Sequence, residues 1–208
     1  MSATSQRSFA FLQSVNDLLQ DHSEFDQVAY IKAALHGGLG TKSIFAEGVC
    51  AALCVYVISD WLNQGTRKKP VDQLVQDCNE LNTVRPTLQP INDLSHIFDH
   101  GDEGARELAI KRIAELSNGK KPKSTKMEIK PGQAIESTKG LGPTFMAWGG
   151  LVKTGHAILC DASKRVIFDP NVGYYQATDN GDYLKVFGKL VALYPEYSKV
   201  AAVTLYSY

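Results

Sequence analysis

The stretch that decides the fold is EGVCAALCVYVISDWL, residues 47–62. From about Val49 to Leu62 it reads as a helix with apolar side chains on nearly every side. A helix of this kind is typical of one buried in the middle of a domain. The stretch is interrupted by Asp60 and is too short to span a bilayer, so we expect no transmembrane segment. The sequence therefore predicts a central buried helix on which other elements pack.

Apolar residues recur at helical spacing on both sides of this central helix. The segments that show the pattern are Phe9 to Leu19, Phe25 to Leu35, Val71 to Leu81 and Glu103 to Leu116. A Pro-containing stretch around residues 85–90 separates the last two. The first half of the chain is therefore predicted to be helical.

The character of the sequence changes after the polar, basic connection NGKKPKSTK, residues 118–126. Beyond it lie short segments rich in Ile, Val, Phe and Tyr that read as strands: MEIK, AIES, TFMAWGGLV, HAILCD, RVIFD and AAVTLYSY. One helix, Asp182 to Leu193, interrupts them. We predict an α+β chain, a single domain over 1–208, with a helical part (1–118) packed on a C-terminal antiparallel sheet (126–208).

The bulk composition narrows the class of protein. Lys and Arg number 22, as do Asp and Glu, so the net charge is zero, which argues against nucleic acid as a partner. The four cysteines do not form a disulfide framework and are expected to be reduced thiols. The segment MSATSQRSFAFLQSVNDLLQ has neither the apolar core nor the cleavage site of a secretory signal.

Cys50 lies in the first turn of the central helix, two residues after Gly48. The unpaired N–H groups and positive dipole end of a helix N-terminus favour a thiolate, which is the nucleophilic form of cysteine. Gly48 lets the backbone approach a substrate closely. The alternative is a structural thiol, because cysteine in an apolar helix is usually core. Cys54, one turn further on, fits that alternative well.

The segments HAILCD and RVIFD are predicted to form a hairpin. A turn centred between Ala162 and Ser163 places His156 directly opposite Asp169, on the face toward Cys50, with Cβ atoms about 5 Å apart. A carboxylate beside an imidazole fixes its tautomer and stabilises the imidazolium. The alternative is a His–Asp pair on the surface of the sheet.

Together these residues predict a Cys–His nucleophilic site between the helical and the β-rich parts. Cys50, Cys54 and His156 are also conceivable zinc ligands, but a single C-x-x-x-C without a second pair is not typical of zinc sites. The remaining histidines, His22, His36, His96 and His100, lack a spacing that indicates a metal. We expect neither a metal nor a cofactor.

The segments EGVCAALCVYVISDWL, GHAILCD and VIFDPNVGYYQATDNGDYLKVF resemble the YopT-like cysteine proteases, which are bacterial effectors with a papain-like fold. The resemblance spans residues 47–62 and 154–193. It implies a catalytic triad of Cys50, His156 and Asp169 and a protein or peptide substrate, such as a host signalling protein. It also implies a virulence role after secretion by a bacterial injection system into a target cell.

Three other functions remain open for the same fold. A glutamine deamidase or transglutaminase uses the same thiol chemistry on a side-chain amide, and a toxin amidase uses it on cell-wall peptides. A binding module without activity would keep only the fold. The basic run GKKPKSTK, residues 119–126, is either a solvated loop or a docking surface for an acidic partner.

The second oxyanion donor is not evident from the sequence. One donor in such a site is the backbone N–H of the nucleophile, and a Gln or Asn side chain shortly before it often supplies another. Residues 41–46, TKSIFA, contain neither. Ser43 or a main-chain amide of this segment is the substitute we consider.

Overall fold

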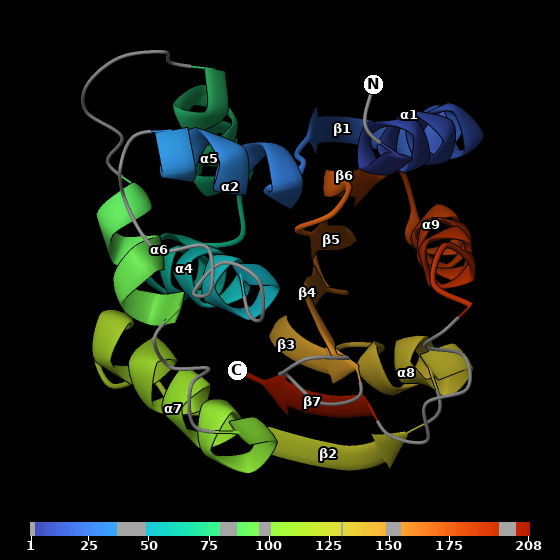
Figure 1. Ribbon diagram of the computed structural model, residues 1–208. Coiled ribbons are helices and arrows are strands. Elements are labelled where there is room, and N and C mark those ends of the chain that lie inside the picture. Colours follow the sequence, from blue (N-terminus) through green and yellow to red (C-terminus); the bar gives the residue numbers. More distant parts are fainter. Residues whose placement is uncertain are drawn as a thin grey trace.

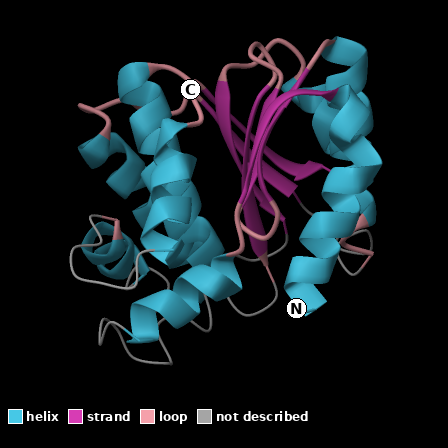
Figure 2. Ribbon diagram, turned by 90° about the horizontal axis from the view of Figure 1, so that it is seen from above, coloured by secondary structure: helices cyan, strands magenta, loops and turns pink. Residues whose placement is uncertain are grey.

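A seven-stranded antiparallel sheet lies between two layers of helices (Figures 1 and 2). The structure is a computed structural model and describes residues 3–36, 49–79, 87–95, 101–129, 131–148, 155–195 and 203–208. In sheet order the strands are β1 (Leu19–Glu24), β6 (Gly173–Ala177), β5 (Val166–Asp169), β4 (His156–Asp161), β3 (Pro143–Trp148), β7 (Val203–Ser207) and β2 (Ser124–Ile129). Every neighbouring pair is antiparallel. The predicted α+β fold class is confirmed.

The helices are divided between the two sides of the sheet. One side of the sheet carries α2 (Gln27–His36), α4 (Val49–Gln64), α5 (Lys69–Asn79), α6 (Leu88–Ser95) and α7 (Gly101–Leu116) (Figure 1). The other side carries α1 (Ala3–Val15), α8 (Pro131–Thr138) and α9 (Asn180–Ala192), and the short 3-10 helix η1 (Asn16–Leu18) links α1 to β1. Two apolar clusters result, one on each side of the sheet.

The central helix α4 is buried on all sides, as its sequence predicts. It packs against β3, β4 and β5 on one side and against α5, α6 and α7 on others. Its inner residues Leu53, Val55 and Ile58 have no exposed surface. Truncating such a side chain, for example Leu53→Ala, is expected to cost about 2–5 kcal/mol of stability.

Two expected elements are different in the structure. The first helix was expected to reach Leu19 but ends at Val15, and Leu19 instead opens strand β1, because its backbone pairs with β6 at the edge of the sheet. The segment AIES, expected as a strand, lies in helix α8. Pro131 at the first position of α8 has a dihedral suited to a helix start, and Ala134 is buried in the cluster that includes α9.

The sheet also contains strand β6, which the sequence reading did not predict. The other expected strands after residue 123 are present as β2, β3, β4, β5 and β7. The division into a helical part (1–118) and a β-rich part (126–208) stays a prediction. Each part also contains an element of the other kind: β1 of the first part belongs to the sheet, and α9 of the second part is a helix. In the part of the chain that the structure describes, no helix has the length and apolar character needed to cross a membrane.

Candidate active site

The candidate nucleophile lies where α4 begins. The helix starts at Val49, as predicted, so Cys50 is in its first turn. The N–H groups of a first turn have no acceptor within the helix and form the positive end of its dipole. Cys50 is 8% exposed, whereas Cys54 is 0% exposed. The two cysteines of this helix therefore differ: one reaches solvent at the helix start and the other lies in the core.

The hairpin that carries the candidate base has a different register from the predicted one. Asp161 pairs with Val166 and Leu159 with Phe168, so the turn is centred one residue later, between Ser163 and Lys164. The expected direct pairing of His156 with Asp169 is therefore wrong, and the two are diagonal neighbours. The change in pairing is two residues, and side chains alternate with period two, so both remain on one face of the sheet.

The His156 and Asp169 side chains still meet. Nε2 of His156 lies 2.9 Å from Oδ1 of Asp169. Their residues are 2% and 0% exposed, so the alternative of a surface pair is wrong. The imidazole also contacts the rings of Trp148, at 6.2 Å between centroids, and of Tyr194, at 5.0 Å. These contacts leave the imidazole little freedom to rotate.

The aromatic neighbours of His156 show where its ring packs. Trp148 and Tyr194 belong to the cluster on the α9 side of the sheet, so the His156 ring packs on that side. His156 is the first residue of β4, so it lies at the end of the sheet where this strand begins. From there its side chain still hydrogen-bonds that of Cys50. The candidate site therefore lies at one end of the sheet, beside the start of α4.

Asp169 is held by more than the imidazole. The Tyr194 hydroxyl donates to its Oδ2 at 2.8 Å, and the backbone N–H of Asn171 donates to its Oδ1 at 2.8 Å. The Asn171 side-chain amide donates to the Tyr194 hydroxyl at 3.1 Å and accepts a hydrogen bond from Gln27 of α2. Asn171 belongs to the FDPN motif, but no sequence signal points to Tyr194 or Gln27. Tyr194 and Asn171 thus hold the two carboxylate oxygens, and Gln27 holds the Asn171 side chain.

The electrostatics of His156 follow from these neighbours. Burial alone lowers the pKa of its imidazole. The charge and hydrogen bond of Asp169, followed by the hydrogen bond and charge of Cys50, outweigh burial and raise that pKa from 6.5 to about 10. The imidazole of His156 is thus placed between an anionic oxygen and a sulfur, and both favour its protonated form.

The thiols of Cys54 and Cys160 are fully buried. Burial raises the pKa of the Cys54 thiol well above its ordinary value, and the charges of Cys50 and Asp169 raise it further. Burial also raises the pKa of Cys160, to about 12. Both thiols keep their proton at neutral pH, which makes them unreactive. Cys54 is the structural cysteine that the sequence indicated.

The other residues considered from the sequence are described only in part. His22 lies on strand β1 and His36 ends helix α2. Residues 41–46, which include Ser43, and His96 and His100 lie outside the described residues. Among the described residues, no group of three or more His, Cys, Asp or Glu side chains is placed to hold a metal ion.

The chain has the papain-like α+β fold, with the candidate cysteine opening its central helix. A solved structure, that of the Pseudomonas avirulence protein AvrPphB, is similar with a TM-score of 0.52 and 17% sequence identity. The match covers 76% of this chain and 90% of AvrPphB. At this identity the likeness establishes the shared fold. No family model matches the chain, and no curated protein matches it in sequence.

Proposed function

We propose that this chain is a YopT-like thiol hydrolase that cleaves a protein substrate with Cys50, His156 and Asp169. The observation that carries the proposal is the buried hydrogen bond, 2.9 Å long, between Nε2 of His156 and Oδ1 of Asp169, with Cys50 bonded to the same imidazole. A carboxylate, an imidazole and a thiol in this order are the parts of a nucleophilic triad.

The proposed reaction uses each residue in turn. With Nε2 engaged by Asp169, the other ring nitrogen of His156, Nδ1, is left for the thiol of Cys50 and takes its proton. The thiolate attacks the carbonyl carbon of a peptide bond, and the oxyanion that forms accepts a hydrogen bond from the backbone N–H of Cys50. The imidazolium protonates the nitrogen as the C–N bond breaks. Water then attacks the thioester, gives a proton to His156, and releases Cys50.

The biological role is the further part of the proposal. AvrPphB is named as an avirulence protein of Pseudomonas, and the two chains share a fold. Together with the three motifs in the sequence, this supports an effector that reaches a target cell through an injection system and cuts a host protein there. A reduced cell interior keeps the Cys50 thiol available.

The experiment compares wild-type protein with Cys50→Ala in a lysate of target cells. Cleavage is expected to create new protein N-termini with the wild type only, detected by labelling of α-amino groups and mass spectrometry. A deamidase would instead give a mass gain of about one dalton without a break in the chain. If the wild type neither cleaves a peptide bond nor deamidates a side chain, in a lysate where Cys50 alkylates rapidly, the proposal of a hydrolase is contradicted.

A further inference from the structure

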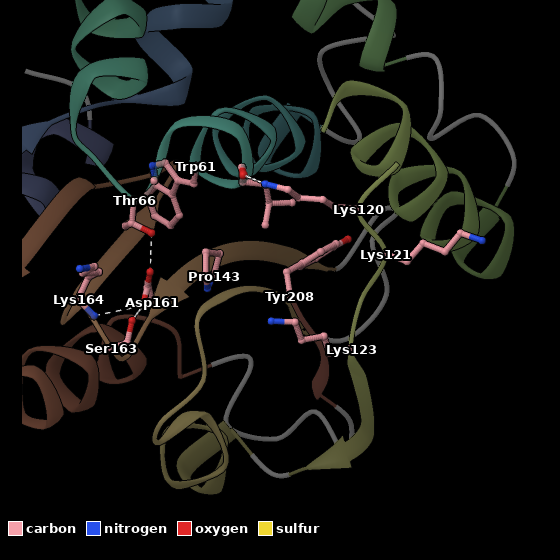
Figure 3. A pocket seen from close by; sticks show the side chains of 12 residues that line it. Trp61, Thr66, Lys120, Lys121, Lys123, Pro143, Asp161, Ser163, Lys164 and Tyr208 are labelled. Carbon is pink, nitrogen blue, oxygen red and sulfur yellow. Dashed lines mark hydrogen bonds between the residues drawn. The ribbon is translucent and has the colours of Figure 1, made fainter. Parts of the chain in front are cut away.

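A pocket of about 600 Å³ opens at the far end of α4 from Cys50 (Figure 3). Trp61 of the last turn of α4, Pro143 and Tyr208 give it apolar walls. Four lysines also line it: Lys120, Lys121, Lys123 and Lys164. Helix α4 has 16 residues and is about 24 Å long. The pocket is therefore separate from the candidate active site.

The charge around this pocket is strongly one-sided. The whole chain has a net charge of zero, yet four lysines and a single acidic side chain, Asp161, line the pocket. Asp161 is 2% exposed, and its oxygens already accept hydrogen bonds from Thr66 and Ser163 and from the backbone N–H of Lys164. One engaged carboxylate against four ammonium groups leaves the pocket positive.

The basic run from residue 119 is held in place by the structure. Asn63 in the last turn of α4 donates to the carbonyl of Leu116 at 2.8 Å and accepts from Asn118 at 3.2 Å. Lys120 donates to the carbonyl of Leu62, at the negative end of α4. The backbone of Lys123 donates to Ser207 at 2.7 Å. These bonds fix the backbone around the run, while the side chains of Lys120, Lys121 and Lys123 are exposed, as expected of a solvated loop.

The charges of three of these lysines are not neutralised by an ion pair among the described residues. Lys121, Lys123 and Lys164 form no ion pair with any residue in the described ranges of the chain. In Figure 3 the amine of Lys123 points toward the middle of the pocket, Lys164 lies at its opposite rim, and Lys121 points outward. Lysine side chains on an exposed rim turn easily toward an anion.

We propose that this pocket binds a compact polyphosphate. Lysine binds phosphate as a point charge, and the rim carries lysines without any arginine. The volume lies within the range of small-molecule sites, about 300–1,000 Å³. Several phosphates on one small frame match charges gathered round one hollow. Carboxylates of an extended acidic peptide are instead spread along the chain at about 3.3 Å per residue. The apolar walls accommodate the carbon frame of the ligand.

The test uses the full chain and isothermal titration calorimetry with inorganic tripolyphosphate. Saturable binding is expected, and the double variant Lys123→Ala, Lys164→Ala should weaken it by about tenfold or more. The control is Lys32→Ala, Lys185→Ala, which removes the same charge from two exposed lysines on α2 and α9 and should stay within about twofold of wild type. Both variants replace exposed side chains, and thermal unfolding checks that they fold.

Two further measurements separate the sources of phosphate and the rival partner. Sedimentation with vesicles that contain phosphatidylinositol bisphosphate distinguishes a lipid headgroup from a free ligand. Weaker binding of either the vesicles or tripolyphosphate by the variant Lys123→Ala, Lys164→Ala supports the proposal. No saturable tripolyphosphate binding, or equal loss in the control variant, overturns it. Binding of a glutamate-rich peptide through the same lysines, without binding of tripolyphosphate, overturns it in favour of protein docking.

Discussion

The hydroxyl of Tyr194 lies 2.8 Å from Oδ2 of Asp169 and occupies the carboxylate oxygen that His156 leaves free. Tyr194 follows α9 and also contacts the imidazole ring itself, at 5.0 Å between centroids. One residue thereby fixes both the candidate base and its acidic partner. In the proposed mechanism Tyr194 is a positioning residue, since it acts on the reacting atoms through Asp169 and His156.

Tyr194→Phe tests this role. The variant keeps the ring contact but removes a donor to Asp169 and an acceptor for Asn171. We expect a loss of about 1–3 kcal/mol in unfolding free energy. We expect kcat to fall by about tenfold with KM unchanged, because orientation of the catalytic groups is disturbed and substrate binding is not.

The matched control is Tyr175→Phe. Its hydroxyl is also buried and donates to the carbonyl of Val172 at 2.6 Å. This variant should lose a similar amount of stability and keep its kcat. Equal kcat values for the two variants would show that Tyr194 has only a structural role.

Cys50 and Cys54 should behave oppositely when replaced. Cys50→Ser is expected to abolish turnover and to change the unfolding free energy by less than about 1 kcal/mol, because the volume is kept. Cys54→Ala should retain turnover and lose about 1 kcal/mol, because it leaves a small cavity in the core of α4. Activity assays and chemical denaturation of both variants check this. Turnover by the Cys50 variant would exclude it as the nucleophile.

Alkylation distinguishes the thiols without any substrate. Because their pKa values are raised, Cys54 and Cys160 should react with iodoacetamide only after unfolding. Cys50, whose side chain is hydrogen-bonded to that of His156 and partly exposed, should react in the native protein. Peptide mapping after a short exposure at neutral pH identifies the modified residue, and equal labelling of Cys50 and Cys54 would contradict the prediction.

Asp169→Asn is the sharpest test of the triad. The amide presents an N–H where the imidazole N–H needs an acceptor, and it removes the charge that raises the pKa of His156. We expect turnover to fall on the order of 10³-fold and alkylation of Cys50 to slow, with the fold intact by circular dichroism. Normal turnover and normal alkylation would leave a Cys–His dyad.

The raised pKa of His156 also predicts how stability depends on pH. A folded-state pKa above the unfolded value means that the folded protein holds the proton more tightly. The stabilisation is therefore fully present below pH 6.5 and is lost as the pH rises toward about 10. The unfolding free energy of the wild type should exceed that of His156→Gln by an amount that shrinks over this interval. A difference independent of pH would contradict the assignment.

The sequence allowed α4 and the three candidate residues to be predicted because their signals are local. Apolar residues on every side of a helix identify it as buried, and a Cys at its start, a strand beginning with His156 and a strand ending with Asp169 are short-range patterns. The hairpin register was predicted two residues off, because sequence does not determine where a four-residue turn is centred. His156 and Asp169 still lie on the same face of the sheet only because the shift in pairing is an even number of residues.

Other features depend on distant contacts. LQDHSE has no alternating apolar pattern, and its strand conformation in β1 comes from pairing with β6. Tyr194 is 25 residues from Asp169 along the chain and reaches it only after α9 has packed on the sheet. Its role therefore has no sequence signature.

The pairing of β1 with β6 affects the order in which the chain acquires its structure. During synthesis β1 leaves the ribosome long before its partner, residues 173–177, is made. Pairings between segments so far apart in sequence form slowly, since a large loop must close first. The sheet edge at β1 is therefore completed only after residues 173–177 have been made, and until then β1 is an unpaired strand that a chaperone can bind.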